Sequence, residues 1–175
     1  SDSTDRIFFD RESKCCSYSP SLSNFMVGAI LADQTPAMVE GRDSLMARLK
    51  ENLGVSPLAV LPPPTYSLLY RHSPNAFGRN RRLRCPHFNS VSGTCCIWRY
   101  RQPTCVTWFC KHLRGKIGQT FWARLRTYLN SICNELSLWC VLQLNIGSDG
   151  LVTLESLYRK ELSGENLLPN ELDGL

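Results

Sequence analysis

Apolar residues recur at helical spacing in several parts of the chain. A first helix is expected near 21–32, because its apolar side chains fall three and four residues apart. The Thr35-Pro36 pair interrupts this pattern, since proline cannot continue a helix. A second helix is expected over 36–53, with Gly54 at the position where a glycine commonly ends a helix.

The longest helical pattern runs over 118–144, where apolar side chains recur along about seven turns. We expect Cys133 and Cys140, on one face of this helix, to be small apolar residues of the core. A last short helix is expected over 151–162, and the polar segment 165–175 is expected to be a flexible tail.

The middle of the chain has no clear periodicity. Prolines at 62–64 exclude the interior of a helix and favour an extended linker or a packed loop. Residues 66–71 are expected to form a short strand or a helical turn. Residues 73–104 are rich in Pro, Gly, Asn and Arg, which indicates long loops that something must organise. The pattern therefore predicts a mainly α protein, with one small domain over 1–164 and a loop-built site in its middle.

The composition changes this picture mainly through cysteine. The chain has 175 residues, of which 43% are hydrophobic, 20% are charged and nine are cysteine. Nine is an odd number, and residues 1–6 lack the features of an export signal, so reduced thiols in the cytoplasm are favoured over a disulfide framework. No apolar run is long enough to span a membrane, so a soluble protein is expected.

Six cysteines form the candidate ligand set for a metal. Four such sulfurs suffice for a tetrahedral zinc site or for an iron–sulfur cluster, although the spacing matches neither a C-x2-C zinc motif nor a bacterial ferredoxin. Soft thiolates favour these metals over Mg²⁺ or Ca²⁺. We expect a zinc ion, with iron or an iron–sulfur cluster as the alternative. The candidate ligands are Cys15, Cys16, Cys85, Cys95, Cys105 and Cys110.

Three further residues are additional candidates. His87 and His112 each follow a candidate cysteine by two residues. Each is either a ligand, a donor that orients a ligand, or an imidazole hydrogen-bonded within a loop. Cys96 is directly adjacent to Cys95 and is kept as a reserve ligand.

Four short motifs in this region are similar to those of a known family. They read Cys85-Pro86-His87-Phe88, Gly93-Thr94-Cys95-Cys96-Ile97-Trp98, Arg101-Gln102-Pro103-Thr104-Cys105 and Trp108-Phe109-Cys110-Lys111-His112. The set resembles the YkgJ-type cysteine-cluster family, which implies a domain that chelates zinc or iron. Cys15-Cys16 resembles the closing pair of that family's N-terminal CxxxCxxCC cluster, which is incomplete here. Some relatives resemble a flagellin lysine methylase with an iron–sulfur cluster, which implies radical chemistry as an alternative.

The remaining signals are weighed against simpler interpretations. The net charge of +5 permits an anionic partner without requiring one. A run of arginines suggests either a phosphate contact or a solvated loop that offsets thiolate charge, and we favour the loop. The arginines are Arg79, Arg81, Arg82 and Arg84. The four tryptophans could stack on bases, but we expect them in the core. They are Trp98, Trp108, Trp122 and Trp139.

We therefore expect a metal-binding protein with a structural or metal-handling role and no catalytic residues. An iron–sulfur protein in redox or radical chemistry is the first alternative, and a basic zinc module that binds nucleic acid is the second. The expected partner is the metal ion. A protein partner is left open, and no membrane partner is expected.

Overall fold

The computed structural model describes residues 10, 12–73, 76–108, 114–145, 147–150, 152, 153 and 156. This part of the chain is mainly helical, as the sequence predicted. The helices are α1 (Asn24–Ala32), α2 (Val39–Lys50), α3 (Pro64–His72), α4 (Pro103–Thr107) and α5 (Gly115–Gln143), with 3-10 turns η1 (Pro36–Met38), η2 (Arg81–Leu83) and η3 (Trp98–Tyr100). The strands are β1 (Leu22–Ser23), β2 (Ala59–Val60), β3 (Phe88–Asn89) and β4 (Thr94–Cys95), and they form the antiparallel pairs β1–β2 and β3–β4.

The helices predicted in the first third of the chain are present, with shifted ends. The helix expected near 21–32 begins only at Asn24, because Leu22 and Ser23 pair with β2 instead. The helix expected over 36–53 is η1 followed by α2, and it ends at Lys50. The helix predicted over 151–162 lies largely outside the described residues, and the tail 165–175 lies wholly outside them.

Of the two alternatives for 66–71, the helical one is correct, and the linker expected over the prolines ends at Pro63. Helix α3 begins at Pro64, where a strand or a single helical turn was expected a little further on. Proline fits the first turn of a helix, because that backbone nitrogen would have no intrahelical acceptor and its fixed φ is already helical. Helix α4 begins in the same way at Pro103.

A small core joins α1, α2 and the loop that carries the candidate ligands. Its buried members are Leu22, Ile30, Met38, Leu45, Val60 and Ile97. Gly41 of α2 lies so close to this loop that a Cβ on it would be 2.6 Å from the carbonyl oxygen of Cys96. Cys95 and Cys96 pack against the core, so this contact fixes the β3–β4 hairpin relative to α2.

Protein hydrogen bonds organise the long loops of the middle region. The N-terminal arm lies against them: Cys85 N donates to Cys16 O at 2.6 Å, and Ser17 Oγ donates to Ala76 O at 3.0 Å. From α3, the hydroxyl of Tyr66 donates to Ser17 O at 2.6 Å. The arm, α3 and the loops around Cys85 are therefore held together by direct hydrogen bonds.

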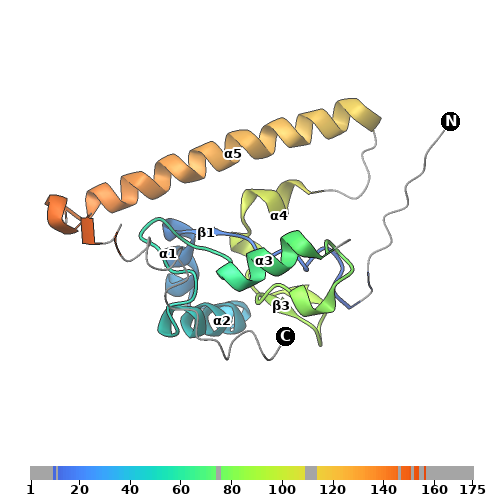
Figure 1. Cartoon of the computed structure of the whole chain (residues 1–175), viewed down its shortest axis with the longest axis horizontal. Coiled ribbons are helices and arrows are strands. Elements are labelled where there is room, and N and C mark those ends of the chain that lie inside the picture. The colour runs from blue at the N-terminus through green and yellow to red at the C-terminus, as the bar shows by residue number, and fades with distance from the viewer. Residues whose placement is uncertain are drawn as a thin grey trace.

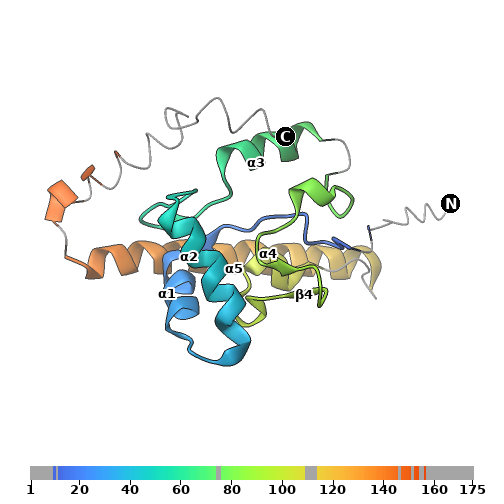
Figure 2. The same ribbon diagram turned by 90° about the horizontal axis from the view of Figure 1, so that it is seen from below.

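Helix α5 lies along one side of the molecule, with α1 to α4 on the other side (Figure 1), and in the view from below it extends behind them (Figure 2). It packs against α4, α1 and β1. Asn24 Nδ2 donates to Ser137 O at 2.9 Å, and Gln102 Nε2 donates to Asn130 Oδ1 at 3.2 Å. None of the described helices is both long enough and apolar enough to cross a lipid bilayer.

The prediction that the tryptophans belong to the core was wrong for three of the four. Trp98 is 64% exposed, Trp139 is 57% exposed and Trp108 is 39% exposed. Trp122 is half-buried on α5. Trp139 is exposed because α5 carries apolar residues around more of its circumference than its neighbouring elements cover. Trp98 lies at the surface, where its ring is covered by the guanidinium group of Arg101.

Candidate metal centre

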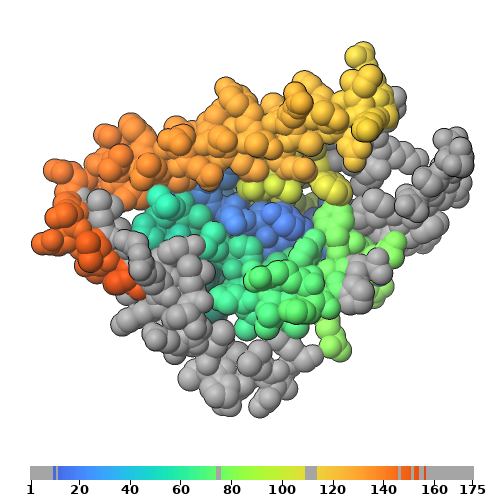
Figure 3. Space-filling model, turned by 45° about the horizontal axis from the view of Figure 1, so that its top comes forward, coloured from blue at the N-terminus to red at the C-terminus, as the bar shows by residue number. Residues whose placement is uncertain are grey.

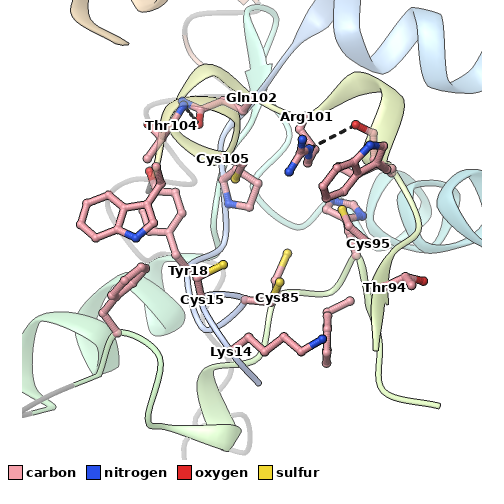
Figure 4. A pocket seen from close by; sticks show the side chains of 18 of the residues that line it. Lys14, Cys15, Tyr18, Cys85, Thr94, Cys95, Arg101, Gln102, Thr104 and Cys105 are labelled. Atoms are coloured by element: carbon pink, nitrogen blue, oxygen red, sulfur yellow. Dashed lines mark hydrogen bonds between the residues drawn. The ribbon is translucent and has the colours of Figure 1, made fainter. Parts of the chain in front are cut away.

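Five of the six candidate cysteines border a single cavity of about 790 Å³. They come from four separate parts of the chain: the arm, the loop before β3, strand β4 and helix α4. Figure 4 shows the side chains of Cys15, Cys85, Cys95 and Cys105 around one central space. Cys16 borders the same cavity. Residues that are up to 90 positions apart in the sequence are thus brought to one site, as a shared ligand set requires.

Local structure holds each thiol at the cavity. The side chain of Asp10 accepts hydrogen bonds from Glu12 N and Ser13 N, which sets the turn that carries Cys15 and Cys16. On the opposite wall, Cys95 pairs with Phe88 in the hairpin. Gln102 caps α4 by accepting from Thr104 N at 2.9 Å, one residue before Cys105.

Burial keeps most of these thiols protonated at neutral pH. Burial, together with the charges of nearby Cys95 and Cys105, raises the pKa of Cys85 to about 12. Burial also raises the pKa of Cys105 to about 11, while the guanidinium of Arg101 opposes the rise. Because the thiolates would repel one another here, a cation among them would favour the deprotonated forms.

The adjacent pair Cys15-Cys16 behaves differently. A hydrogen bond from Cys16 lowers the pKa of Cys15 to about 6, with smaller help from the charges of Arg101 and Lys14. The same bond raises the pKa of Cys16. The hydrogen bond therefore favours the thiolate of Cys15 over that of Cys16, and a thiolate is the form that binds metal.

His87 is the histidine that the structure brings to the site. Its side chain is fully buried, it borders the cavity, and Nδ1 lies 2.9 Å from Ser44 Oγ. Ser44 has one hydroxyl hydrogen, which it donates to Gly41 O at 3.0 Å, so we assign the hydrogen of the imidazole to Nδ1. Nε2 then carries a lone pair and has no hydrogen-bond partner. Burial, followed by the charge of Arg48, lowers the pKa of His87 to about 4, so the ring is neutral.

Two cationic side chains border the cavity beside the thiols. The guanidinium carbon of Arg101 lies 3.2 Å from the centroid of the Trp98 ring, and Arg101 Nε donates to Trp98 O at 3.2 Å. Lys14 Nζ donates to Gly93 O at 3.1 Å. These charges offset part of the negative charge that several thiolates would bring.

The other candidate residues are not at the cavity, or are not described. Cys96 Sγ donates to His87 O at 3.1 Å and packs on the core, so it is not among the residues that border the cavity. Cys110 and His112 lie outside the described residues. Cys133 and Cys140 are half-buried on α5, away from the cavity.

The donor set suits a thiophilic metal, although the described thiols do not close around one point. Five cysteine sulfurs and an imidazole nitrogen are ligands that zinc and iron prefer. Over the described ranges, however, no three side chains of His, Cys, Asp or Glu form a group that could hold one ion. To bind a single ion, the segments that carry the thiols would therefore have to move closer together, or a residue outside the described part of the chain would have to supply a further ligand.

The arginine run beside the cavity is partly occupied by protein contacts. Arg81 forms ion pairs with Asp10 at 2.9 Å and with Glu12 at 2.8 Å. Arg84 lies over the ring of Phe88, with its guanidinium carbon 5.9 Å from the ring centroid. These contacts favour the interpretation as a structural loop, because phosphate binding would compete with them.

Sequence reasoning missed three polar residues of the site. Arg101 stands inside one of the cysteine motifs and Lys14 directly precedes Cys15, so proximity to cysteine was the available signal. Ser44 had no such signal, because α2 meets His87 only in the folded chain.

Comparison with known proteins adds no assignment: no family model, no curated protein and no solved structure matches this chain.

Proposed function

We propose that this protein binds a thiophilic metal, zinc or iron, at the cysteine-lined cavity. The observation that carries the proposal is that Cys15, Cys16, Cys85, Cys95 and Cys105 border one cavity although they come from four parts of the chain. Cysteine often fills a protein core, but of these five only Cys85 is buried, and five cysteines around one cavity are more than packing requires. His87, with its buried and unpartnered Nε2, is a further ligand candidate.

The proposed role is structural or metal-handling rather than catalytic. A metal bound by Cys85, Cys95 and Cys105, with Cys15 or Cys16, would join the arm, the β3–β4 hairpin and α4 in one cross-link. When bound, it supplies binding energy that counts toward folding. Among the described residues, no Asp or Glu borders the cavity, so none can orient His87 as a general base.

An iron–sulfur cluster is the second candidate, and the spread of the thiols favours it. A cluster is larger than one ion, so its cysteine ligands are further apart than the ligands of a single zinc. The described thiols share a wide cavity without forming a group that could hold one ion. Such a cluster would support redox chemistry, which a zinc ion does not.

The metal content of the full chain, purified anaerobically without added metal, tests this proposal. We expect about one bound ion or one cluster per chain. Zinc gives a colourless protein, whereas an iron–sulfur cluster gives broad visible absorption and inorganic sulfide in addition to iron. Elemental analysis and a visible spectrum of the same sample separate the two.

A chain that is purified without bound metal, takes up neither zinc nor iron when they are added, and keeps its unfolding midpoint in a strong chelator would overturn the proposal. Cys140→Ser is the matched control, since this half-buried cysteine lies on α5 and does not border the cavity. It should contain as much metal as the wild-type chain.

A further inference from the structure

Helix α5 exposes a stripe of large apolar side chains on the face opposite its packing partners. We call this stripe the outer face, and it consists of Ile117, Phe121, Tyr128, Ile132, Trp139 and Leu142. Their exposed fractions range from 37% to 78%. Ser137 and Val141, on the inner face, are buried. Figure 3 shows one side of α5 open to solvent along its length.

The outer face is regular and large enough for a stable contact. Successive members are four, seven, four, seven and three residues apart, which is close to the seven-residue repeat of helices that pack side by side. The 29-residue helix is about 43 Å long. The six side chains expose roughly 600 Å² per copy, so two copies facing each other would bury about 1,200 Å². That area reaches the lower limit of specific interfaces, and an exposed apolar patch of this size commonly marks an interaction site.

The charges on this face favour a second copy in antiparallel orientation. Arg124 and Glu135 are both exposed and lie on the same side of α5 as the outer face. They are equally far from the point midway between Leu129 and Asn130. When two antiparallel copies are centred on that point, Arg124 of each copy faces Glu135 of the other. A parallel pair would instead place like charges opposite each other, which is unfavourable.

The same register also pairs apolar residues near the two ends of α5, and it brings opposite helix ends together. Ile117 of one copy then faces Leu142 of the other, and Phe121 faces Leu138, whose side chain is 48% exposed. The first turn of α5 has no acidic residue and its last turn has no basic residue. Antiparallel pairing places each positive helix N-terminus beside the negative C-terminus of the other copy, which compensates both dipoles.

We infer that α5 forms a symmetric, antiparallel dimer with α5 of a second copy. The contact is isologous, so it closes at two chains and does not propagate into a filament. A lipid surface is a less favourable partner for the outer face than a second copy. A helix that lies on a membrane exposes its polar face, with its basic residues, to solvent. In α5 the face opposite the outer face is instead packed against the rest of the protein. Binding to lipid would also bring the negative charge of Glu135 into contact with the membrane, which is unfavourable.

Sedimentation equilibrium of the full chain over a concentration series tests the inference. We expect a monomer–dimer equilibrium with a dissociation constant in the micromolar range. Tyr128→Glu places a charge near the centre of the contact in both copies and should raise that constant at least about 100-fold. Gln119→Glu adds the same charge at an exposed position off the outer face and should leave the constant within about threefold.

A charge exchange tests the orientation. Arg124→Glu alone and Glu135→Arg alone each create like-charge contacts and should weaken the dimer roughly tenfold. The double variant restores opposite charges and should return to within about threefold of the wild-type constant. A chain that remains monomeric at concentrations of about 100 μM overturns the dimer. If the double variant loses as much dimerisation free energy as the two single variants lose together, the antiparallel register is wrong. Neither outcome depends on metal content, so this inference and the proposed metal site fail separately.

Discussion

Cys85→Ser is expected to remove the bound metal and to lower the free energy of unfolding by at least about 3 kcal/mol. Cys85 is the most buried of the cysteines that border the cavity, and its backbone nitrogen donates to Cys16 O. A serine at this position fits the space but offers a hydroxyl, which is a poor ligand for zinc or iron at neutral pH. Metal per chain and urea denaturation measure the two effects.

Chelation separates the loss of a ligand from an ordinary packing defect. Without metal, wild type and Cys85→Ser should differ by less than about 1 kcal/mol in the free energy of unfolding, because the substitution itself is small. Cys140→Ser should behave like the wild-type chain with and without metal. If Cys85→Ser kept a full complement of metal, Cys85 would not be a ligand.

Gly54→Ala is expected to destabilise the fold by about 3 kcal/mol or more. Gly54 has a φ of +69°, a conformation that is strained for alanine, and its added Cβ would lie 2.0 Å from the carbonyl oxygen of Leu61. The backbone cannot move away easily, because Leu61 N donates to Gly54 O at 2.6 Å. The buried side chain of Arg48 also donates to Leu61 O, so the whole connection after α2 would be disturbed.

Gly28→Ala is the matched comparison. Gly28 is exposed on α1, and a Cβ on it would have no atom within 4 Å. Alanine there should raise the free energy of unfolding by roughly 0.5–1 kcal/mol, because glycine is a poor helix former. Urea denaturation of both variants checks the pair, and equal stability of Gly54→Ala and the wild-type chain would contradict the structure around Leu61.

Periodicity was enough to locate α1 and α2, and it indicated a helix where α5 lies. It left a strand or a helical turn open where α3 lies, and it gave no sign of the short helix α4, which begins at Pro103 at the end of a stretch that was expected to be loop. Proline excludes a helix interior but suits its first turn, so Pro64 and Pro103 mark helix starts rather than gaps.

The two faces of α5 show a second limit of the pattern. Phe121 and Trp139 belong to the same run of helically spaced apolar residues as the covered side chains of α5, and the sequence predicted a core position for Trp139. Only contacts with neighbouring helices decide which apolar residues are covered, and those contacts are made by α1 and α4 on one side. When the apolar residues of a helix cover a wider stripe than its neighbours bury, the excess indicates a further interaction surface.

The sequence was enough to predict which cysteines share a site, but it could not predict which other residues surround them. Cysteine spacing in a loop-rich region suggested that Cys85, Cys95 and Cys105 share a site, and they border one cavity. The Ser44–His87 hydrogen bond depends on how α2 packs against the hairpin, and no local pattern encodes that contact. Spacing also could not show that Cys96, next to Cys95, bonds to a backbone carbonyl instead of bordering the cavity.

The most direct test of the central claim is X-ray absorption at the metal edge of the anaerobically purified chain. A centre held by the cavity cysteines predicts a first shell dominated by sulfur at about 2.3 Å, with at most one nitrogen from an imidazole such as His87. An iron–sulfur cluster would add a metal–metal distance beyond that shell. A first shell made only of nitrogen and oxygen would contradict the account, because the five thiols around the cavity would then have no part in holding the metal.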